Sequence, residues 1–148
     1  MKIEYIDDKL IIYLRDYFFK NYDIKELTKD IKELFSRLLY YYKIELSGLY
    51  EVIIYDNKKY GSILEIIKKE DLFNPHVIDI KLKLFKDKDF YFKTNDFFIL
   101  SNYNNIYYDN NDYYININNI DDINKVIEFG NILYNKKDNY LISKYFIK

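Results

Sequence analysis

Residues 23–42, DIKELTKDIKELFSRLLYYY, decide the fold that the sequence predicts. Apolar residues recur here three, four and seven positions apart, which places them on one stripe of an α-helix. The stripe consists of Ile24, Leu27, Ile31, Leu34, Phe35, Leu38 and Leu39, and Tyr42 continues it. Asp23, followed three residues later by Glu26, is typical of a helix N-terminus. We therefore expect a long amphipathic helix that packs on a sheet with this stripe inward.

Four runs rich in β-branched and aromatic residues predict strands around this helix. They are residues 3–6, 10–14, 49–55 and 60–68. The turn residues Asp7-Asp8-Lys9 separate the first two runs, and residues 56–59 separate the last two. The sequence therefore predicts two hairpins, and Gly61, near the start of a strand, fits a bulge.

The second half of the chain is a series of short elements. Residues 78–84 alternate Ile or Leu with charged residues, which predicts a strand with one buried and one wet face. The shorter predicted strands are residues 90–93, 97–100, 106–108, 113–117 and 131–134. Residues 121–129 predict a short helix ended by Gly130, a residue suited to a helix C-terminus, and we expect the tail to be helical.

Together these elements predict an α+β fold. We expect a mostly antiparallel sheet, one long amphipathic helix packed on it, and short helical pieces near the C-terminus. Runs of strands, rather than alternating strands and helices, argue against a doubly wound parallel sheet. The 148 residues fit a single domain. If the chain has two lobes, we expect their seam in the polar loop at residues 69–76, which holds the only proline.

The composition argues against several classes of protein. With no cysteine and one histidine, the chain lacks a disulfide scaffold, a thiol nucleophile and the ligands for a closed zinc site. No apolar run is long enough to span a bilayer, and the charged N-terminus predicts no signal peptide, so we expect a cytoplasmic protein without a membrane partner. The net charge of −1, with Arg15 and Arg37 as the only arginines, argues against binding to duplex DNA.

The residues that most often carry chemistry show no catalytic pattern. His76, the only imidazole, falls in a loop, and no serine has the G-x-S-x-G pattern of a nucleophile elbow. The three glycines are isolated, which argues against a phosphate-binding loop. Residues 109–112 resemble a calcium loop in their oxygen content, but the required Gly and Glu are missing downstream. Adjacent acids are interpreted as solvated turn residues (Asp7-Asp8, Glu70-Asp71 and Asp121-Asp122). We predict no catalytic residue, no metal site and no cofactor.

Two other kinds of function stay open at this point. Residues 81–93, KLKLFKDKDFYFK, interleave cations and aromatic residues as single-stranded RNA platforms do, and Lys81, Lys83, Lys88 and Lys93 would carry such binding. Asp87 and Asp89 weaken the positive field of this stretch, and nucleic acid is not the partner that we favour. An enzyme that uses carboxylates and tyrosines, with Mg²⁺, is the other alternative.

Tyrosines are the strongest indication of a binding surface. Three tyrosines occupy residues 40–42, where one helix face cannot hold them all, and two pairs flank the turn at residues 109–112, so one of each pair should point outward. Tyrosine is enriched at the centres of protein interfaces. The abundance of Tyr, Asn, Ile and Lys also fits an A/T-rich genome. We predict that Tyr40, Tyr41, Tyr107, Tyr108, Tyr113 and Tyr114 contact a partner protein.

Parts of the chain resemble MecA-type adaptor proteins. Residues 1–8, the helix ending Glu33-Leu34-Phe35 and the hairpin at 49–67 are similar in order to the N-terminal domain of that family. Near the C-terminus, the segments that resemble its second domain are residues 105–108, 112–115, 128–132 and 141–146. The resemblance implies a non-enzymatic adaptor that carries substrates to a Clp-type unfoldase. The chain departs from the family in lacking an acidic interdomain linker and the helices between the strands of the second domain.

The missing chemistry and the exposed tyrosines predict a non-enzymatic protein-interaction module, either an adaptor or another regulatory protein. A small inhibitor or immunity-type protein that blocks one target is the alternative within the same class. The partner is another protein in both cases. Binding to an unfoldase would favour the adaptor, and binding to a single toxin or nuclease would favour the inhibitor.

Overall fold

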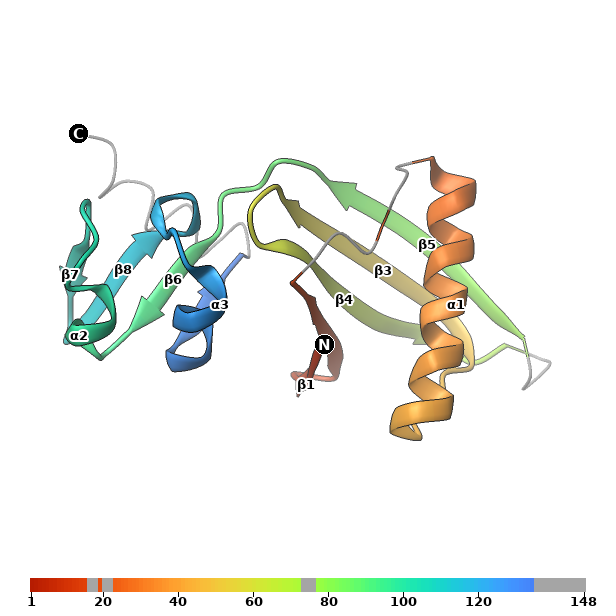
Figure 1. Cartoon of the computed structure of the whole chain (residues 1–148). Coiled ribbons are helices and arrows are strands. Elements are labelled where there is room, and N and C mark those ends of the chain that lie inside the picture. Colours follow the sequence, from red (N-terminus) through yellow and green to blue (C-terminus); the bar gives the residue numbers. More distant parts are fainter. Residues whose placement is uncertain (16–18, 20–22, 73–76, 135–148) are drawn as a thin grey trace. The chain divides into compact units, whose positions relative to one another are not determined.

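The protein is described by a computed structural model that covers residues 1–15, 19, 23–72 and 77–134. It confirms the predicted α+β class, with two mostly antiparallel sheets and one long helix in this part of the chain (Figure 1). The chain forms two compact units. Unit 1 comprises residues 1–56 and 61–86, and unit 2 comprises residues 57–60 and 87–148.

The boundary between the two units does not lie at residues 69–76, where we predicted a seam. The chain passes from one unit to the other after residues 56, 60 and 86. Residues 69–72 belong to unit 1, and residues 73–76 lie outside the described residues. Compact units in one chain can fold together or separately, so the single domain stays a prediction.

Unit 1 is built on a sheet of five strands in the order β1-β2-β4-β3-β5. Their bounds are β1 (Lys2–Ile6), β2 (Lys9–Leu14), β3 (Gly48–Asn57), β4 (Gly61–Glu70) and β5 (Ile78–Phe85). β2 pairs antiparallel with β1 and with β4, whereas β5 pairs parallel with β3. The predicted strands of unit 1 are thus confirmed, and β1 and β5 form the two edges of the sheet.

Two turns of unit 1 show why their residues suit them. Asp7 and Asp8 both have positive φ, 50° and 62°, in the two-residue turn between β1 and β2, a conformation that Asp tolerates better than most residues. Gly61 has a φ of 121°, and a Cβ atom there would collide with the backbone of Leu14 and Arg15. Glycine is therefore required at this position by its backbone conformation and by the close approach of the neighbouring strand.

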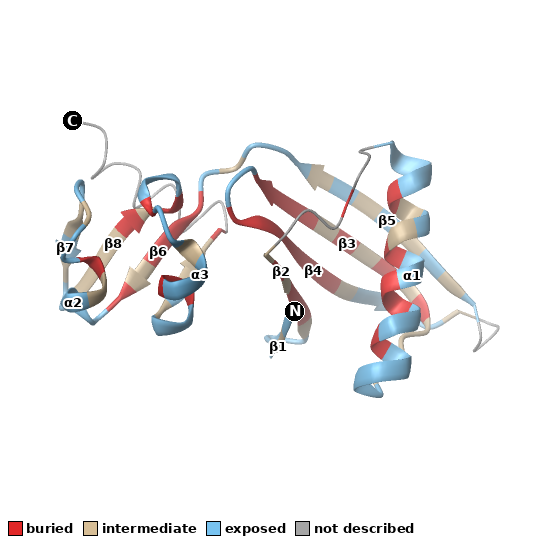
Figure 2. Cartoon of the chain, in the orientation of Figure 1, coloured by how far each residue is buried: buried red, intermediate tan, exposed pale blue. Residues whose placement is uncertain are grey.

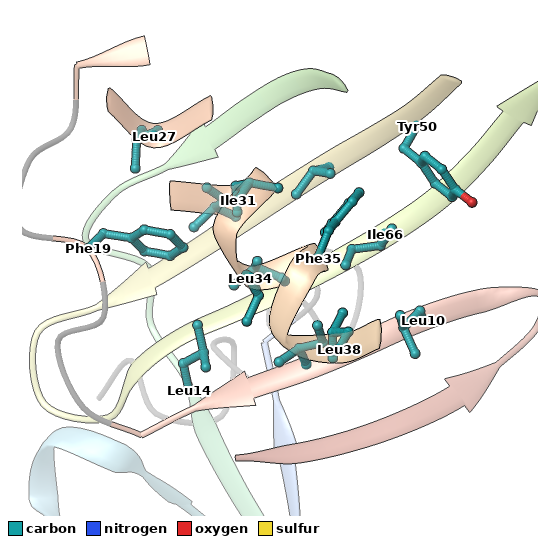
Figure 3. Close-up of a cluster of buried hydrophobic side chains, with 14 residues drawn as sticks. Leu10, Leu14, Phe19, Leu27, Ile31, Leu34, Phe35, Leu38, Tyr50 and Ile66 are labelled. Carbon is teal, nitrogen blue, oxygen red and sulfur yellow. The ribbon is translucent and has the colours of Figure 1, made fainter. Parts of the chain in front are cut away.

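The long helix α1 (Ile24–Tyr42) covers one face of this sheet. Asp23 caps it, since its carboxylate accepts a hydrogen bond from the backbone N–H of Lys25 at 2.8 Å. The residues of α1 that are buried against the sheet are Leu27, Ile31, Leu34, Phe35 and Leu38 (Figure 3). They pack with Leu10, Leu14, Tyr50 and Ile66 from three strands. The predicted helix and its inward stripe are confirmed over this stretch.

The stripe was predicted too long at both ends. Ile24 is 71% exposed, Leu39 50% and Tyr42 47%, although all three were expected to face the core. The first and last turns of α1 are exposed, while the buried side chains run from Leu27 to Leu38 (Figure 2). Periodicity shows which residues share a helix face, but the extent of the sheet decides how many of them are covered.

Unit 2 is built on a smaller sheet of four strands in the order β7-β8-β6-β9. Their bounds are β6 (Tyr91–Thr94), β7 (Tyr107–Asp109), β8 (Asp112–Asn116) and β9 (Asn131–Leu133). All three pairings are antiparallel, and the strands predicted at residues 90–93, 106–108, 113–117 and 131–134 are confirmed. The short helical pieces are α2 (Phe97–Leu100), the 3₁₀ turn η1 (Ile117–Asn119), α3 (Ile123–Val126) and the 3₁₀ turn η2 (Ile127–Phe129).

Aromatic side chains fill much of the core of unit 2. Phe90 and Phe92 are completely buried, and the ring of Phe90 lies 5.8 Å from that of Tyr60 and 6.2 Å from that of Tyr134. The aliphatic core residues come from α2, β8, η1, α3, η2 and the segment after η1, and they are Leu100, Ile115, Ile117, Ile120, Val126 and Ile127. Short elements therefore contribute one or two core side chains each.

Two predictions in unit 2 are wrong in detail. Residues 97–100, predicted as a strand, form α2, because Asp96 accepts a hydrogen bond from the backbone N–H of Phe98 at 3.0 Å and caps a helical turn. Gly130 does not adopt the left-handed conformation of a helix C-terminus, since its φ is −170°. A Cβ atom at Gly130 would instead collide with the carbonyl oxygen of Lys93 and the ring of Phe92, so close packing requires this glycine.

Candidate functional site: exposed aromatic side chains

The tyrosines at the end of α1 are exposed, as predicted for Tyr40 and Tyr41. They are 73% and 71% exposed, and their rings meet edge to face with centroids 4.9 Å apart. The helix ends at Lys43, which has a φ of 57° and whose ammonium group donates to the carbonyl of Tyr40 at 3.4 Å. With Leu39 and Tyr42, four successive large side chains of unit 1 are thus open to water.

The other four predicted tyrosines lie on the β7–β8 hairpin of unit 2, on two opposite faces. Tyr107 is paired with Tyr114, and Tyr108 with Tyr113. The ring centroids are 6.0 Å apart in the first pair and 4.8 Å apart in the second. Tyr108 is 53% exposed, whereas the other three are half-buried. The structure therefore brings these tyrosines together in pairs across the strands.

Tyr107 and Tyr114 lie beside charged groups. The ammonium group of Lys93 lies 6.0 Å from the centre of the Tyr114 ring and 3.6 Å from the carboxylate of Asp112. A cation over an aromatic ring is attracted to its electron-rich face. This face of the hairpin is thus already engaged in contacts within unit 2.

Tyr108 and Tyr113 lie beside Phe97 of α2, which was not among the predicted partner-binding residues. The ring of Phe97 is 5.2 Å from that of Tyr113, which in turn contacts Tyr108. Phe97 is 47% exposed, and Phe98, the next residue of α2, is 86% exposed. We call Phe97, Phe98, Tyr108 and Tyr113 the aromatic surface.

The aromatic surface is held in place by its local structure. Leu100 anchors α2 because its side chain is completely buried, and the hydroxyl of Ser101 donates to the carbonyl of Phe98 at 2.9 Å. Asn110 and Asn111 adopt positive φ in the hairpin turn, and the hydroxyl of Tyr108 donates to the side-chain oxygen of Asn111 at 2.9 Å. The exposed rings are therefore presented on ordered backbone, which lowers the entropy lost when a partner binds.

A local signal for Phe97 and Phe98 is present in the sequence. Asp96 directly precedes the two phenylalanines, and Asp is a common helix N-cap. A helical turn of four residues can bury only part of an apolar run, so some of its apolar side chains must face water. We interpreted the run as a strand because short apolar runs do not distinguish strand from helix.

The lysines of the predicted RNA platform do not form a set of free cations. Lys83 lies 3.4 Å from the carboxylate of Glu51, and Lys93 lies 3.6 Å from that of Asp112. Burial alone would raise the pKa of Glu51, but the hydrogen bond from Lys83 and the charges of Lys69 and Lys83 outweigh it and lower the pKa. Lys81 and Lys83 belong to unit 1, whereas Lys88 and Lys93 belong to unit 2.

The structure gives three further results on candidate sites and membrane segments. His76 lies outside the described residues, as does the predicted helical tail. Among the residues that the structure covers, no group of three or more His, Cys, Asp or Glu side chains is placed to hold a metal ion. Likewise, none of the helices in the described ranges has the length and apolar character needed to cross a membrane.

Comparisons with known proteins give no family for this chain. No family model matches the sequence, no curated protein is significantly similar to it, and no solved structure matches its fold. The resemblance to MecA-type adaptors therefore stays a prediction.

Proposed function

We propose that this protein is a non-enzymatic interaction module that binds another protein through the aromatic surface of unit 2. The observation that carries the proposal is the exposure of Phe98, which is 86%, next in α2 to Phe97, whose ring contacts Tyr113 and through it Tyr108. Leaving a phenylalanine side chain in water forgoes roughly 1.5–3 kcal/mol of burial free energy. A cluster of such rings on ordered backbone is typical of the centre of a protein interface.

The aromatic surface is a better candidate than the α1 tyrosines. Tyr40 and Tyr41 carry hydroxyl groups that water can solvate, so their exposure costs less. Phe97 and Phe98 have no polar group, and their exposure is unfavourable until a partner covers them. We therefore assign the main contact to unit 2 and treat the α1 tyrosines as the comparison site.

A protein partner fits this surface better than RNA does. Aromatic rings can also stack on bases, but RNA platforms combine them with cations that contact phosphates. The charged residue that adjoins Phe97 in sequence is Asp96, whereas Asp109 and Asp112 lie on the opposite face of the hairpin, with Tyr107 and Tyr114. Acidic side chains repel phosphates and favour a partner with an apolar or basic surface.

The experiment is affinity purification of the tagged full-length chain from its native cell, followed by quantitative mass spectrometry. Three forms are compared: the wild type, the variant Phe98→Ala/Tyr108→Ala, and the matched control Tyr40→Ala/Tyr41→Ala. We expect one partner protein that is enriched by the wild type and by the control but lost with the unit 2 variant. All four side chains are largely exposed, so thermal unfolding should show changes in stability within about 0.5 kcal/mol.

Each of the other outcomes counts against part of the proposal. Loss of the partner with Tyr40→Ala/Tyr41→Ala alone would move the contact to α1. No enriched protein, together with turnover in a broad substrate screen, would contradict a non-enzymatic module. The identity of the partner separates the two roles within this class, since an unfoldase supports the adaptor and a single toxin or nuclease supports the inhibitor.

A further inference from the structure

Within the described part of the chain, one edge of the strand β5 carries backbone groups that have no strand partner. β5 lies at the end of the unit 1 sheet, and among the described residues it pairs only with β3. The carbonyl of Val77, just before β5, accepts a hydrogen bond from the N–H of Gly48 at 3.0 Å, so this residue faces β3. Backbone groups alternate in direction along a strand. Residues 78, 80, 82 and 84 therefore direct their N–H and C=O groups toward the free edge.

A hydrogen bond at Ile80 supports this assignment. Its N–H donates to the carboxylate of Asp79, the preceding residue, at 2.9 Å, rather than to a neighbouring strand. The carboxylate occupies a backbone donor that an incoming strand could use. Exposed edges of this kind pair readily with another strand unless something blocks them.

The same four residues carry an apolar row. Ile78, Ile80, Leu82 and Leu84 are half-buried against the core of unit 1, and the alternate residues between them point to the opposite face and are exposed. Part of this apolar row therefore stays in contact with water. A strand added to β5 would cover it while pairing the free backbone groups.

The charges on β5 favour a second copy of this strand in one register. Two copies of β5 can pair antiparallel about a two-fold axis, and the residue at the axis then lies opposite itself in the copy. With residue 79 at the axis, Asp lies opposite Asp. With residue 81 or 82 at the axis, Lys lies opposite Lys. A centre at Ile80 places Asp79 opposite Lys81 of the copy, twice, and no like charges face each other. It also places Ile80 opposite Ile80 and Ile78 opposite Leu82, on the half-buried face.

We propose that two copies of this chain pair through β5 in antiparallel orientation about a two-fold axis at Ile80. The N–H of Ile80 then donates to the carbonyl of Ile80 in the copy instead of to the carboxylate of Asp79. The carboxylate of Asp79 in turn forms an ion pair with the ammonium group of Lys81 in the copy. Each of the outward-facing residue pairs exchanges two backbone hydrogen bonds. The two five-stranded sheets thereby become one continuous sheet.

The other sheet edges in the described part of the chain are less suited to this pairing. β7 and β9 are three residues long. β1 has five residues, and its charged pair, Lys2 and Glu4, already forms an ion pair at 2.9 Å within the strand. In the register centred on Ile80, residues 78–82 of β5 lie opposite each other in the two copies, and each copy contributes three apolar side chains, Ile78, Ile80 and Leu82, on the half-buried face.

The experiment measures the molar mass of the full-length chain by sedimentation equilibrium. We expect a dimer at a concentration of about 100 μM, and a dissociation constant in the micromolar range. Asp79→Lys places Lys opposite Lys81 of the copy, and Lys81→Asp places Asp opposite Asp79, so each variant should raise the dissociation constant at least about tenfold. An equimolar mixture of the two variants should dimerise again, because each chain then offers the charge that the other lacks.

Two further variants locate the interface. Ile80→Lys brings two ammonium groups together at the axis and should give a monomer, whereas Ile3→Lys, at a similar edge position in β1, should leave the dimer intact. Circular dichroism checks that both variants fold. A wild-type chain that is monomeric at about 100 μM overturns the proposal. The proposal is also overturned if Asp79→Lys, Lys81→Asp and Ile80→Lys all leave the dimer unaffected. The same holds if the dimer is lost only with Ile3→Lys.

Discussion

The two units of the molecule are stabilised in different ways. In unit 1, one helix of 19 residues buries five large side chains on a five-stranded sheet. In unit 2, elements of three to five residues are joined by individual polar contacts. The hydroxyl of Thr94 donates to the carbonyl of Phe129 at 2.9 Å, and the side-chain amide of Asn57 donates to the carbonyl of Lys88 at 2.7 Å. Apolar burial along one element therefore dominates unit 1, whereas single contacts between short segments are decisive in unit 2.

The largest expected effect tests the helix of unit 1. Leu38 is completely buried, and its neighbour Leu39 is 50% exposed on the same helix. We expect Leu38→Ala to lower the free energy of unfolding by about 3 kcal/mol, because it removes buried methyl groups and leaves a cavity. Leu39→Ala should change it by less than about 0.5 kcal/mol. Urea unfolding followed by circular dichroism measures both, and similar losses in the two variants would contradict the burial of this helix face.

The next effect compares a glycine of each unit. Gly61 combines a positive φ with a close backbone approach, whereas Gly130 has an extended backbone and only the close approach. Gly61→Ala should therefore be the more destabilising, by about 3 kcal/mol against about 1–2 kcal/mol for Gly130→Ala. The comparison uses the same urea unfolding measurement. If the Gly130→Ala variant were as stable as the wild type, the result would contradict the close packing that we infer between η2 and β6.

The same difference between the units explains how far the fold could be predicted from sequence. The helix α1 and the alternation in β5 extend over many residues, so their periods are unambiguous. α2 is four residues long, and its helical form depends on one capping bond from Asp96. The parallel pairing of β5 with β3 joins distant parts of the chain, and no local pattern encodes it.

The candidate site was predictable only in part. The period of α1 predicted that Tyr40 and Tyr41 would be exposed, and they are; the hairpin pattern predicted only that one tyrosine of each pair would point outward, and it did not single out Tyr108, which is 53% exposed. Phe97 and Phe98 were missed because their exposure depends on the buried Leu100, which fixes the orientation of α2. Which exposed rings cluster is a property of the packed unit rather than of any short segment.

A smaller effect compares the two helix caps. Asp23 caps α1 of unit 1, and Asp96 caps α2 of unit 2, each through a hydrogen bond from the backbone N–H two residues later. Asp23→Ala should lower the free energy of unfolding by about 1 kcal/mol, the usual value for a lost N-cap. Asp96→Ala should have a smaller effect on stability. It should still weaken binding of the partner, because the cap orients Phe97 and Phe98.

The control for the caps is Asp23→Asn and Asp96→Asn, since asparagine can also accept the capping hydrogen bond. Both Asn variants should be within about 0.5 kcal/mol of the wild type. If Asp96→Ala left both stability and partner binding unchanged, the cap would not determine the position of the two phenylalanines.

The smallest effect is absent at neutral pH and concerns one buried tyrosine of each unit. Burial, followed by the charge of Glu65, raises the pKa of Tyr55 in unit 1 to about 12, and burial, followed by Asp89, raises the pKa of Tyr91 in unit 2. The unfolded chain loses the phenol proton near its ordinary pKa of about 10, before the folded chain does. Unfolding is therefore favoured as the pH rises from about 10 to about 12, and below about 10 the shift has no effect.

Tyr55→Phe isolates this contribution because phenylalanine has no proton to lose. We expect the difference in unfolding free energy between Tyr55→Phe and the wild type to be constant below about pH 9 and to shift in favour of the variant by about pH 11. Tyr91→Phe should shift in the same direction, because the pKa of Tyr91 is also raised by burial. The difference in unfolding free energy between Tyr55→Phe and the wild type could instead stay the same from pH 9 to pH 11. The fold would then not hold the phenol of Tyr55 in its neutral form. The sheet face of unit 1 opposite α1 would also be wetter than the burial of Tyr55 and Glu65 implies.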